Sequence, residues 1–124
     1  MGRFTVTVTL LPGQGARAGS RSLDALVDTG AAYTVVPRPL LEALGCRPHR
    51  GQPVRFADGR VEEWPVAEIR VECEGRYTTT PVMMGPAAGP VLMGAITLEA
   101  LGLGVDPVNR RLVPAQLHLA QAGR

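Results

Sequence analysis

The segment Ala25-Leu-Val-Asp-Thr-Gly-Ala-Ala-Tyr-Thr-Val-Val-Pro37 places one carboxylate between two apolar, strand-like runs. Residues 25–27 precede Asp28, and the β-branched residues 34–36 follow it after a short Gly-containing stretch. A carboxylate flanked by buried strands is costly to desolvate, so it requires hydrogen bonds, a partner charge or a proton of its own. Asp28 is therefore the first candidate for a functional residue.

Size, charge and cysteine content exclude several classes of protein. The chain has 124 residues, which suits one domain with a single hydrophobic core. The net charge is +2, and all 13 basic residues are Arg, scattered along a chain with few aromatic residues. This favours a solvated surface over a nucleic-acid partner. Cys46 and Cys73 are too few for a disulfide scaffold, and neither a signal peptide nor a membrane span of roughly 18 apolar residues is visible. We therefore expect reduced thiols, a cytoplasmic protein and no membrane partner.

Alternating apolar and polar residues predict many short strands. We expect strands over residues 4–10, 23–27, 34–36, 78–84, 91–93 and 112–119, and a further strand that buries Ile69, Val71 and Cys73. Pro39 at the start and Gly45 just beyond predict a short helix over residues 39–44, and Gly102 predicts the end of a second one over residues 97–101. The pattern predicts an all-β, barrel-like domain with one or two short helices.

One hairpin is marked by its turn. Residues 54–57 and 60–64 flank the pair Asp58-Gly59, which is typical of a tight connection between antiparallel strands. We expect Ala57, Asp58 and Gly59 at its tip.

A short repeat suggests internal symmetry. Leu41-Glu-Ala-Leu-Gly45 recurs as Leu98-Glu-Ala-Leu-Gly102, and each copy follows an apolar strand and a Gly-Ala pair. Two similar half-domains would explain the recurrence. The alternative is that Leu-Glu-Ala-Leu is simply a common helix-forming phrase.

Three segments in this order resemble the retropepsin-like (retroviral-type) aspartic protease family. Asp28-Thr-Gly-Ala31 is similar to its active-site loop, Leu92-Met-Gly94 to the second loop that braces it, and Leu101–Pro107 to bacterial single-domain members. The resemblance covers roughly residues 23 to 114. It implies one protease domain over residues 1–124, a closed β-barrel subunit, and a flap formed by the hairpin.

The resemblance also implies half of a catalytic site in each chain. Two carboxylates that share one proton can activate water and protonate the substrate, whereas this sequence has a single Asp-Thr-Gly. We therefore expect a homodimeric endopeptidase acting on peptide or protein substrates, without cofactor or metal. The resemblance implies catalytic roles for Asp28, Thr29 and Gly30. It implies substrate contacts at Gly30, Ala32, Ala57, Asp58 and Gly59.

The sequence also departs from the viral pattern. Ala32 and Ala95 stand where viral enzymes have an Asp–Arg ion pair, which implies a different dimer interface. Tyr33 either contributes to a substrate pocket or packs against its neighbours. Cys46 and His49 have a spacing usable for metal, but we expect a solvent-exposed pair instead.

Two other functions stay open. The dimer could bind or scaffold peptides with little or no turnover, or the chain could be an unrelated barrel in which Asp28 only caps a turn.

Overall fold

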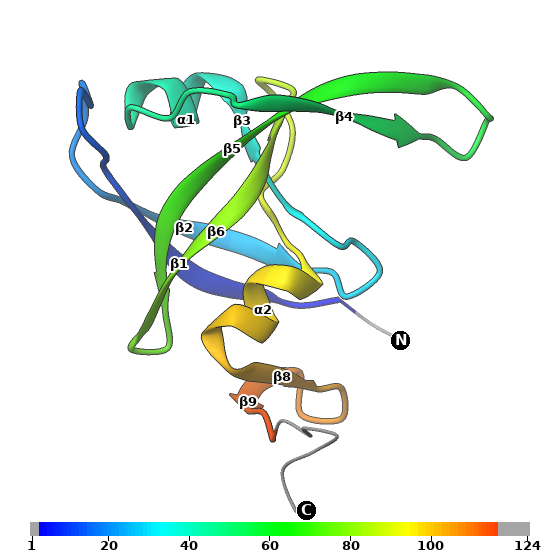
Figure 1. The fold of residues 1–124 in the computed structure, drawn as a ribbon. Coiled ribbons are helices and arrows are strands. Elements are labelled where there is room, and N and C mark those ends of the chain that lie inside the picture. The colour runs from blue at the N-terminus through cyan, green and yellow to red at the C-terminus, as the bar shows by residue number, and fades with distance from the viewer. Residues whose placement is uncertain (1–2, 117–124) are drawn as a thin grey trace, which may run out of the picture.

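Nine strands and two short helices follow one another along residues 3–116, the part of the chain that this computed structural model describes (Figure 1). In chain order they are β1 (Thr5–Leu11), β2 (Arg21–Val27), β3 (Thr34–Pro37), α1 (Arg38–Ala43), β4 (Arg50–Arg55), β5 (Val61–Cys73), β6 (Arg76–Gly85), β7 (Leu92–Met93), α2 (Ala95–Leu101), β8 (Leu103–Asp106) and β9 (Arg111–Pro114).

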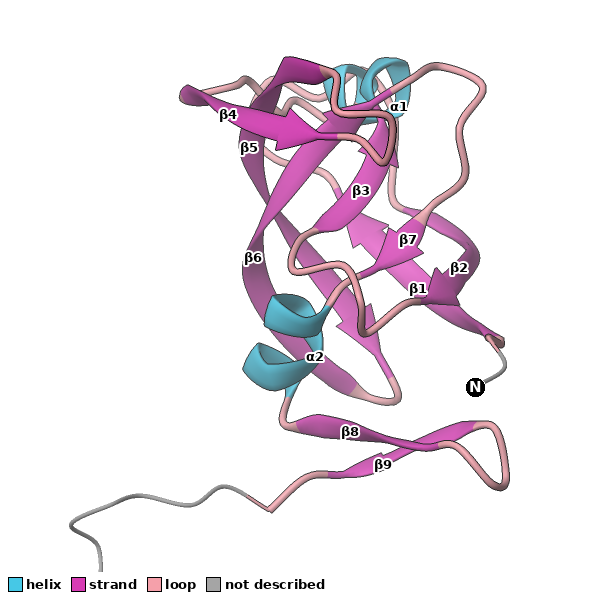
Figure 2. Ribbon diagram, turned by 90° about the vertical axis from the view of Figure 1, so that its right-hand side faces the viewer, coloured by secondary structure: helices cyan, strands magenta, loops and turns pink. Residues whose placement is uncertain are grey.

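Seven strands form one sheet in the order β1-β2-β7-β3-β6-β5-β4. β1 also pairs with β5, so the sheet curls back on itself into a closed barrel. β8 and β9 form a separate two-stranded sheet below α2 (Figure 2). The prediction of an all-β, closed barrel with one or two short helices is confirmed.

The strands bury one face each, as their alternation predicts. In β1, Val8 and Leu10 are buried, and in β2 the buried residues are Ala25 and Val27. These side chains belong to one hydrophobic core that also takes in residues from both helices. The core therefore fixes the end of β2, and with it the start of the loop that carries Asp28.

Both copies of the repeated phrase lie in helices. α1 follows β3 and α2 follows β7, and the two leucines of each phrase are buried. Each phrase ends on a left-handed glycine, Gly45 at φ +88° and Gly102 at φ +72°. This conformation suits Gly and stops the helix.

The structure corrects the bounds of both hairpin strands, and the first of them, predicted over residues 54–57, is β4 at Arg50–Arg55. The sequence predicted a strand ending at Trp64 and a separate one around Ile69, but β5 is a single strand of 13 residues. Pro65 interrupts the pattern without ending the strand. It lies opposite Gly51 of β4, one residue before β5 begins to pair with β6 at Val66.

The closing strand is shorter than predicted within the described residues. β9 spans Arg111–Pro114, whereas residues 117–119 of the prediction lie outside the described part of the chain. Its partner β8 was not predicted, because Leu-Gly-Val-Asp is too short and Gly-rich to stand out. Among the helices of the described residues, none has the length and apolar character needed to cross a membrane.

Candidate active site

Backbone hydrogen bonds fix the position of Asp28 at the end of β2. Its N–H donates to the carbonyl oxygen of Met93 at 3.0 Å, which continues the parallel pairing of β2 with β7. Its own carbonyl oxygen accepts from the N–H of Ala31 at 3.1 Å, which closes a tight turn. The side chain is therefore presented where the chain leaves the sheet.

The carboxylate has both a hydrogen bond and a partner charge. Oδ1 of Asp28 accepts the Gly30 N–H at 3.0 Å, and Oδ2 lies 3.4 Å from Nη2 of Arg3. The Asp28 side chain keeps 21% of its surface exposed. It opens into a small hollow of about 110 Å³, lined by Arg3, Phe4, Val27, Asp28, Thr29, Gly30 and Val105.

The sequence did not single out Arg3. The antiparallel register that pairs Thr5 with Leu26 places Arg3 opposite Asp28 when it is continued by two residues. That register depends on the 12–20 loop between the strands, whose geometry the sequence did not reveal.

The second loop lies directly against the loop of Asp28. The N–H groups of Ala95 and Ile96 donate to the carbonyl oxygens of Ala31 and Ala32, both at 2.9 Å. A Cβ on Gly94 would lie 2.8 Å from the Ala32 carbonyl oxygen and against the backbone of the next residue. The close approach of the two loops therefore requires glycine at this position.

A buried cluster of three threonines supports both loops from inside. Oγ1 of Thr97 lies 2.6 Å from Oγ1 of Thr34 and 2.8 Å from Oγ1 of Thr80. The Gly94 N–H donates to Oγ1 of Thr34 at 3.0 Å. Three elements, β3, β6 and α2, are thus joined by hydroxyl groups directly behind the paired loops. The sequence analysis did not identify this cluster.

An apolar groove of about 570 Å³ lies beside the Asp28 loop. It is lined by Ala31, Ala32, Tyr33, Val35, Gln52, Pro53, Val54, Trp64, Met83 and Ile96. The hydroxyl of Tyr33 accepts a hydrogen bond from Nη2 of Arg50 at 2.8 Å, which ties the loop to the base of the β4–β5 hairpin. Ala32 and Tyr33, both considered from the sequence, are therefore groove residues.

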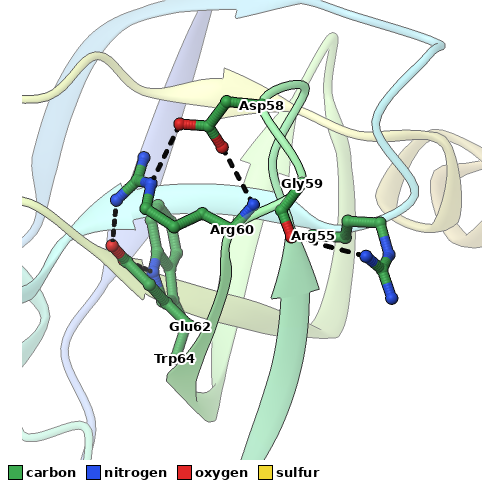
Figure 3. Close-up of polar contacts among 6 residues, drawn as sticks. All are labelled: Arg55, Asp58, Gly59, Arg60, Glu62 and Trp64. Carbon is green, nitrogen blue, oxygen red and sulfur yellow. Dashed lines mark hydrogen bonds and ion pairs between the residues drawn. The ribbon is translucent and has the colours of Figure 1, made fainter.

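The β4–β5 hairpin projects from the barrel on the same side as the Asp28 loop (Figures 1 and 2). Its side chains hold the tip together, with Arg60 at the centre (Figure 3). The Arg60 N–H and Nε donate to the two carboxylate oxygens of Asp58 at 2.9 and 3.2 Å, and its guanidinium also pairs with Glu62. The guanidinium carbon lies 4.5 Å from the ring centre of Phe56, and Gly59 takes φ +89° at the turn.

The predicted tip residues are where the sequence placed them, at the turn between β4 and β5. Ala57, Asp58 and Gly59 are exposed, and they line neither the hollow nor the groove. Their contact with a substrate stays a prediction.

The Cys46–His49 pair is not the exposed pair that we expected. Cys46, three residues after the end of α1, is buried, whereas His49 is exposed. Burial raises the pKa of the Cys46 thiol, and burial with two neighbouring glutamates raises the pKa of Cys73 to about 11. Within residues 3–116 no three His, Cys, Asp or Glu side chains are grouped as a metal would require.

The comparisons below all match proteins that are described as proteases. The model of a family described as "gag-polyprotein putative aspartyl protease" matches residues 15–100. The solution structure of the Simian Foamy Virus (mac) protease is similar with a TM-score of 0.57 and 20% identity, over 77% of this chain and 92% of that one. The EIAV protease complexed with the inhibitor HBY-793 is similar with a TM-score of 0.62 and 21% identity, over 95% of this chain and 94% of that one. At 20% and 21% sequence identity, the similarity to these two structures establishes the fold alone. No curated protein matches the sequence.

Proposed function

Because the chain belongs to the family of gag-polyprotein aspartyl proteases, we propose that it is an endopeptidase that acts as a homodimer through Asp28 of each subunit. The observation that carries the proposal is the setting of Asp28. Its backbone is fixed by two paired loops, while its carboxylate stays partly exposed at the rim of a hollow. A site shared between two copies requires a carboxylate whose backbone is fixed and whose side chain remains accessible to the second subunit.

The second copy is needed because the chemistry uses two carboxylates. The sequence contains one Asp-Thr-Gly, so a single subunit holds one of the pair. In the dimer the two carboxylates share one proton, since two like charges a few ångströms apart do not both ionise easily.

The reaction then proceeds by proton transfer. The ionised Asp28 takes a proton from a water molecule as its oxygen attacks the peptide carbonyl carbon, and the protonated Asp28 gives its proton to the carbonyl oxygen. In the next step one hydroxyl of the tetrahedral intermediate gives a proton to the Asp28 that is now ionised, and the Asp28 that is now protonated gives its proton to the amide nitrogen. The C–N bond then breaks, which leaves a carboxylic acid and an amine and restores the starting pair. In this proposal Thr29 orients the pair, and Gly30 and the flap tip bind the substrate main chain.

The apolar groove supports a peptide as the substrate. It begins at Ala31 and Ala32, three and four residues after Asp28, and reaches across to Val54 on the hairpin. A peptide held between loop and hairpin would place one side chain in this groove. We therefore expect apolar residues to be favoured near the cleaved bond.

Replacing Asp28 by Asn tests the assignment. The variant keeps the shape of the side chain but cannot act as a base, so cleavage of an unfolded protein at mildly acidic pH should fall by about 10³-fold or more. Asp24→Asn is the matched control, because Asp24 lies on the exposed face of the same strand. Sedimentation and circular dichroism should show an unchanged dimer and fold in both variants. Undiminished cleavage by Asp28→Asn would refute the assignment.

A peptide-binding dimer without turnover is the second candidate. This candidate is favoured by the flap tip, because the polar side chains of Asp58, Arg60 and Glu62 are already paired with one another there. Tight peptide binding that is unchanged in Asp28→Asn supports this alternative. Binding of a statine-type transition-state mimic that depends on Asp28 supports the enzyme.

A further inference from the structure

One cationic side chain lies beside the apolar groove. The residues that line the groove are all uncharged. Arg50 is not among them, but its Nη2 donates to the hydroxyl of Tyr33 at 2.8 Å and its Nη1 donates to Oε1 of Gln52. Because Tyr33 and Gln52 both line the groove, the guanidinium of Arg50 lies at the edge of the groove.

The pleat of β4 turns Arg50 toward the same face as two groove residues. Side chains at alternate positions of a strand share one face. Gln52 and Val54 line the groove, and Arg50 lies two residues before Gln52 on the same strand. Across the ladder Gln52 lies opposite Trp64, which also lines the groove. The hydrogen bond between the side chains of Arg50 and Gln52 agrees with this shared face.

Within the described part of the chain, no carboxylate neutralises Arg50. None of the ion pairs found there includes Arg50. Nearer the hairpin tip, Glu62 pairs with Arg60. Glu63 lies over Gly51, where a Cβ would be 2.8 Å from its Oε2, and so belongs to the other face of the hairpin. The positive charge of Arg50 therefore stands beside an uncharged groove without a carboxylate from these residues.

The Arg50 side chain is held in place and still has donors for a ligand. Its Cζ lies 5.8 Å from the ring centre of Tyr33, in addition to the hydrogen bond to the hydroxyl. A guanidinium has more N–H donors than the two that Tyr33 and Gln52 use. A planar guanidinium with free donors is suited to paired hydrogen bonds with a carboxylate.

We propose that Arg50 is a specificity-determining residue that selects peptides with a carboxylate close to the apolar side chain held in the groove. The proposal rests on the proposed function. The carboxylate is an Asp or Glu side chain of the peptide or the peptide's own C-terminus, and it pairs with the remaining N–H donors of Arg50. The uncharged groove and the cation at its edge together define this ligand class.

The exposure of Arg50 limits the size of the preference. Arg50 is exposed, and exposed ion pairs contribute little because water and salt screen them. We therefore expect kcat/KM to be about two- to fivefold higher for a peptide with Glu than for the same peptide with Gln. In about 1 M NaCl the two values should become nearly equal.

The test compares matched peptides at about pH 6, where a Glu side chain is ionised. Digestion of a proteome-derived peptide library by the wild type gives the preferred sequence around the cleaved bond. Synthetic peptides of that sequence then carry Glu or Gln close to the apolar residue, each with a free or an amidated C-terminus. Preference for Glu identifies a side-chain carboxylate as the ligand, and preference for the free terminus identifies the C-terminal carboxylate.

The variants separate charge recognition from a purely structural role. Arg50→Gln should lose the preference, Arg50→Lys should keep part of it, and Arg50→Glu should reverse it in favour of a peptide with Lys. Arg55→Gln is the matched control, because it removes the same charge from the same strand at a position that does not line the groove. If Arg50 only held Tyr33 in place, its replacement would lower cleavage of the Glu and Gln peptides equally.

The outcomes also separate this proposal from the proposed function. If the wild type cleaves peptides through Asp28 but has no preference for a carboxylate, or Arg50→Gln keeps that preference, the role of Arg50 is wrong and the protease stands. If turnover is absent, the fluorescence of Trp64, the single Trp of the chain, measures binding of hexapeptides of Leu and Ala that contain one Glu or one Gln. Tighter binding of the Glu peptide that Arg50→Gln abolishes would keep the role of Arg50 without the protease. Absence of both cleavage and binding would overturn both proposals.

Discussion

Removal of one hydroxyl from the buried threonine cluster should destabilise the protein measurably. Thr97→Val keeps the volume and the β-branched shape of the side chain but deletes Oγ1, which lies within hydrogen-bond distance of both Thr34 and Thr80. Thr97 has no exposed surface, so water cannot replace the lost partner. The change therefore isolates the contribution of the hydroxyl.

The expected magnitude follows from the number of bonds. Two hydrogen bonds are lost, each contributing about 0.5–1.5 kcal/mol, so the free energy of unfolding should fall by about 2 kcal/mol. Both partners keep another contact, Thr34 with the Gly94 N–H and Thr80 with the Pro81 carbonyl oxygen. Neither hydroxyl is left wholly unpaired, and this limits the loss.

Urea denaturation followed by circular dichroism measures the difference. Thr79→Val is the matched control, because Thr79 is the exposed neighbour of Thr80 on β6 and its replacement should change the stability by less than about 0.5 kcal/mol. The denaturant slope should be equal in all three proteins. A Thr97→Val variant as stable as the control would refute the reasoning that the cluster holds β3, β6 and α2 together.

Two further predictions concern other buried positions. Gly94→Ala should lower the free energy of unfolding by about 2–3 kcal/mol, because the new Cβ meets the backbone of Tyr33. Gly19→Ala is the control, because Gly19 has open space around it, and it should be nearly neutral in the same denaturation assay. Equal stability of the two variants would contradict the close packing of the loops. Cys46 and Cys73 should resist a disulfide reagent at pH 8 until the protein unfolds, since burial keeps both thiols protonated. Rapid labelling of the native protein at pH 8 would contradict the burial of the thiols. The folded-state pKa of Cys73 is raised from 9.0 to about 11, so the native state keeps its proton to higher pH and the free energy of unfolding should fall as pH rises from 9 toward 11.

Features with a local signal could be predicted from the sequence. The Asp28 loop, the Leu92-Met-Gly94 loop and the hairpin tip at Asp58-Gly59 each depend on a few neighbouring residues, and the structure has all three. The helix phrases could be located for the same reason, since their leucines and terminal glycines are close in sequence. The roles predicted for Thr29, Gly30, Ala32 and the tip residues remain predictions.

Features that depend on long-range pairing could not be predicted. Arg3 meets Asp28 through the register of β1 and β2, and the threonine cluster brings together residues up to 63 positions apart. A single Thr in a strand gives no signal of a distant hydroxyl partner. Pro65 misled the strand assignment. A proline inside a strand requires a position where its missing N–H has no ladder partner, and the sequence does not show that β5 pairs with β6 only from Val66 on.

The uninterrupted course of β5 has a mechanical consequence. Its first half is paired with β4. Its second half is paired with β6 on one side and, through Arg70–Glu72, with β1 on the other. The β4–β5 hairpin is thus continuous with a segment of β5 that is paired on both sides within the barrel. The position of the hairpin therefore depends on how β5 is paired within the barrel, where Leu10 lies opposite Val71.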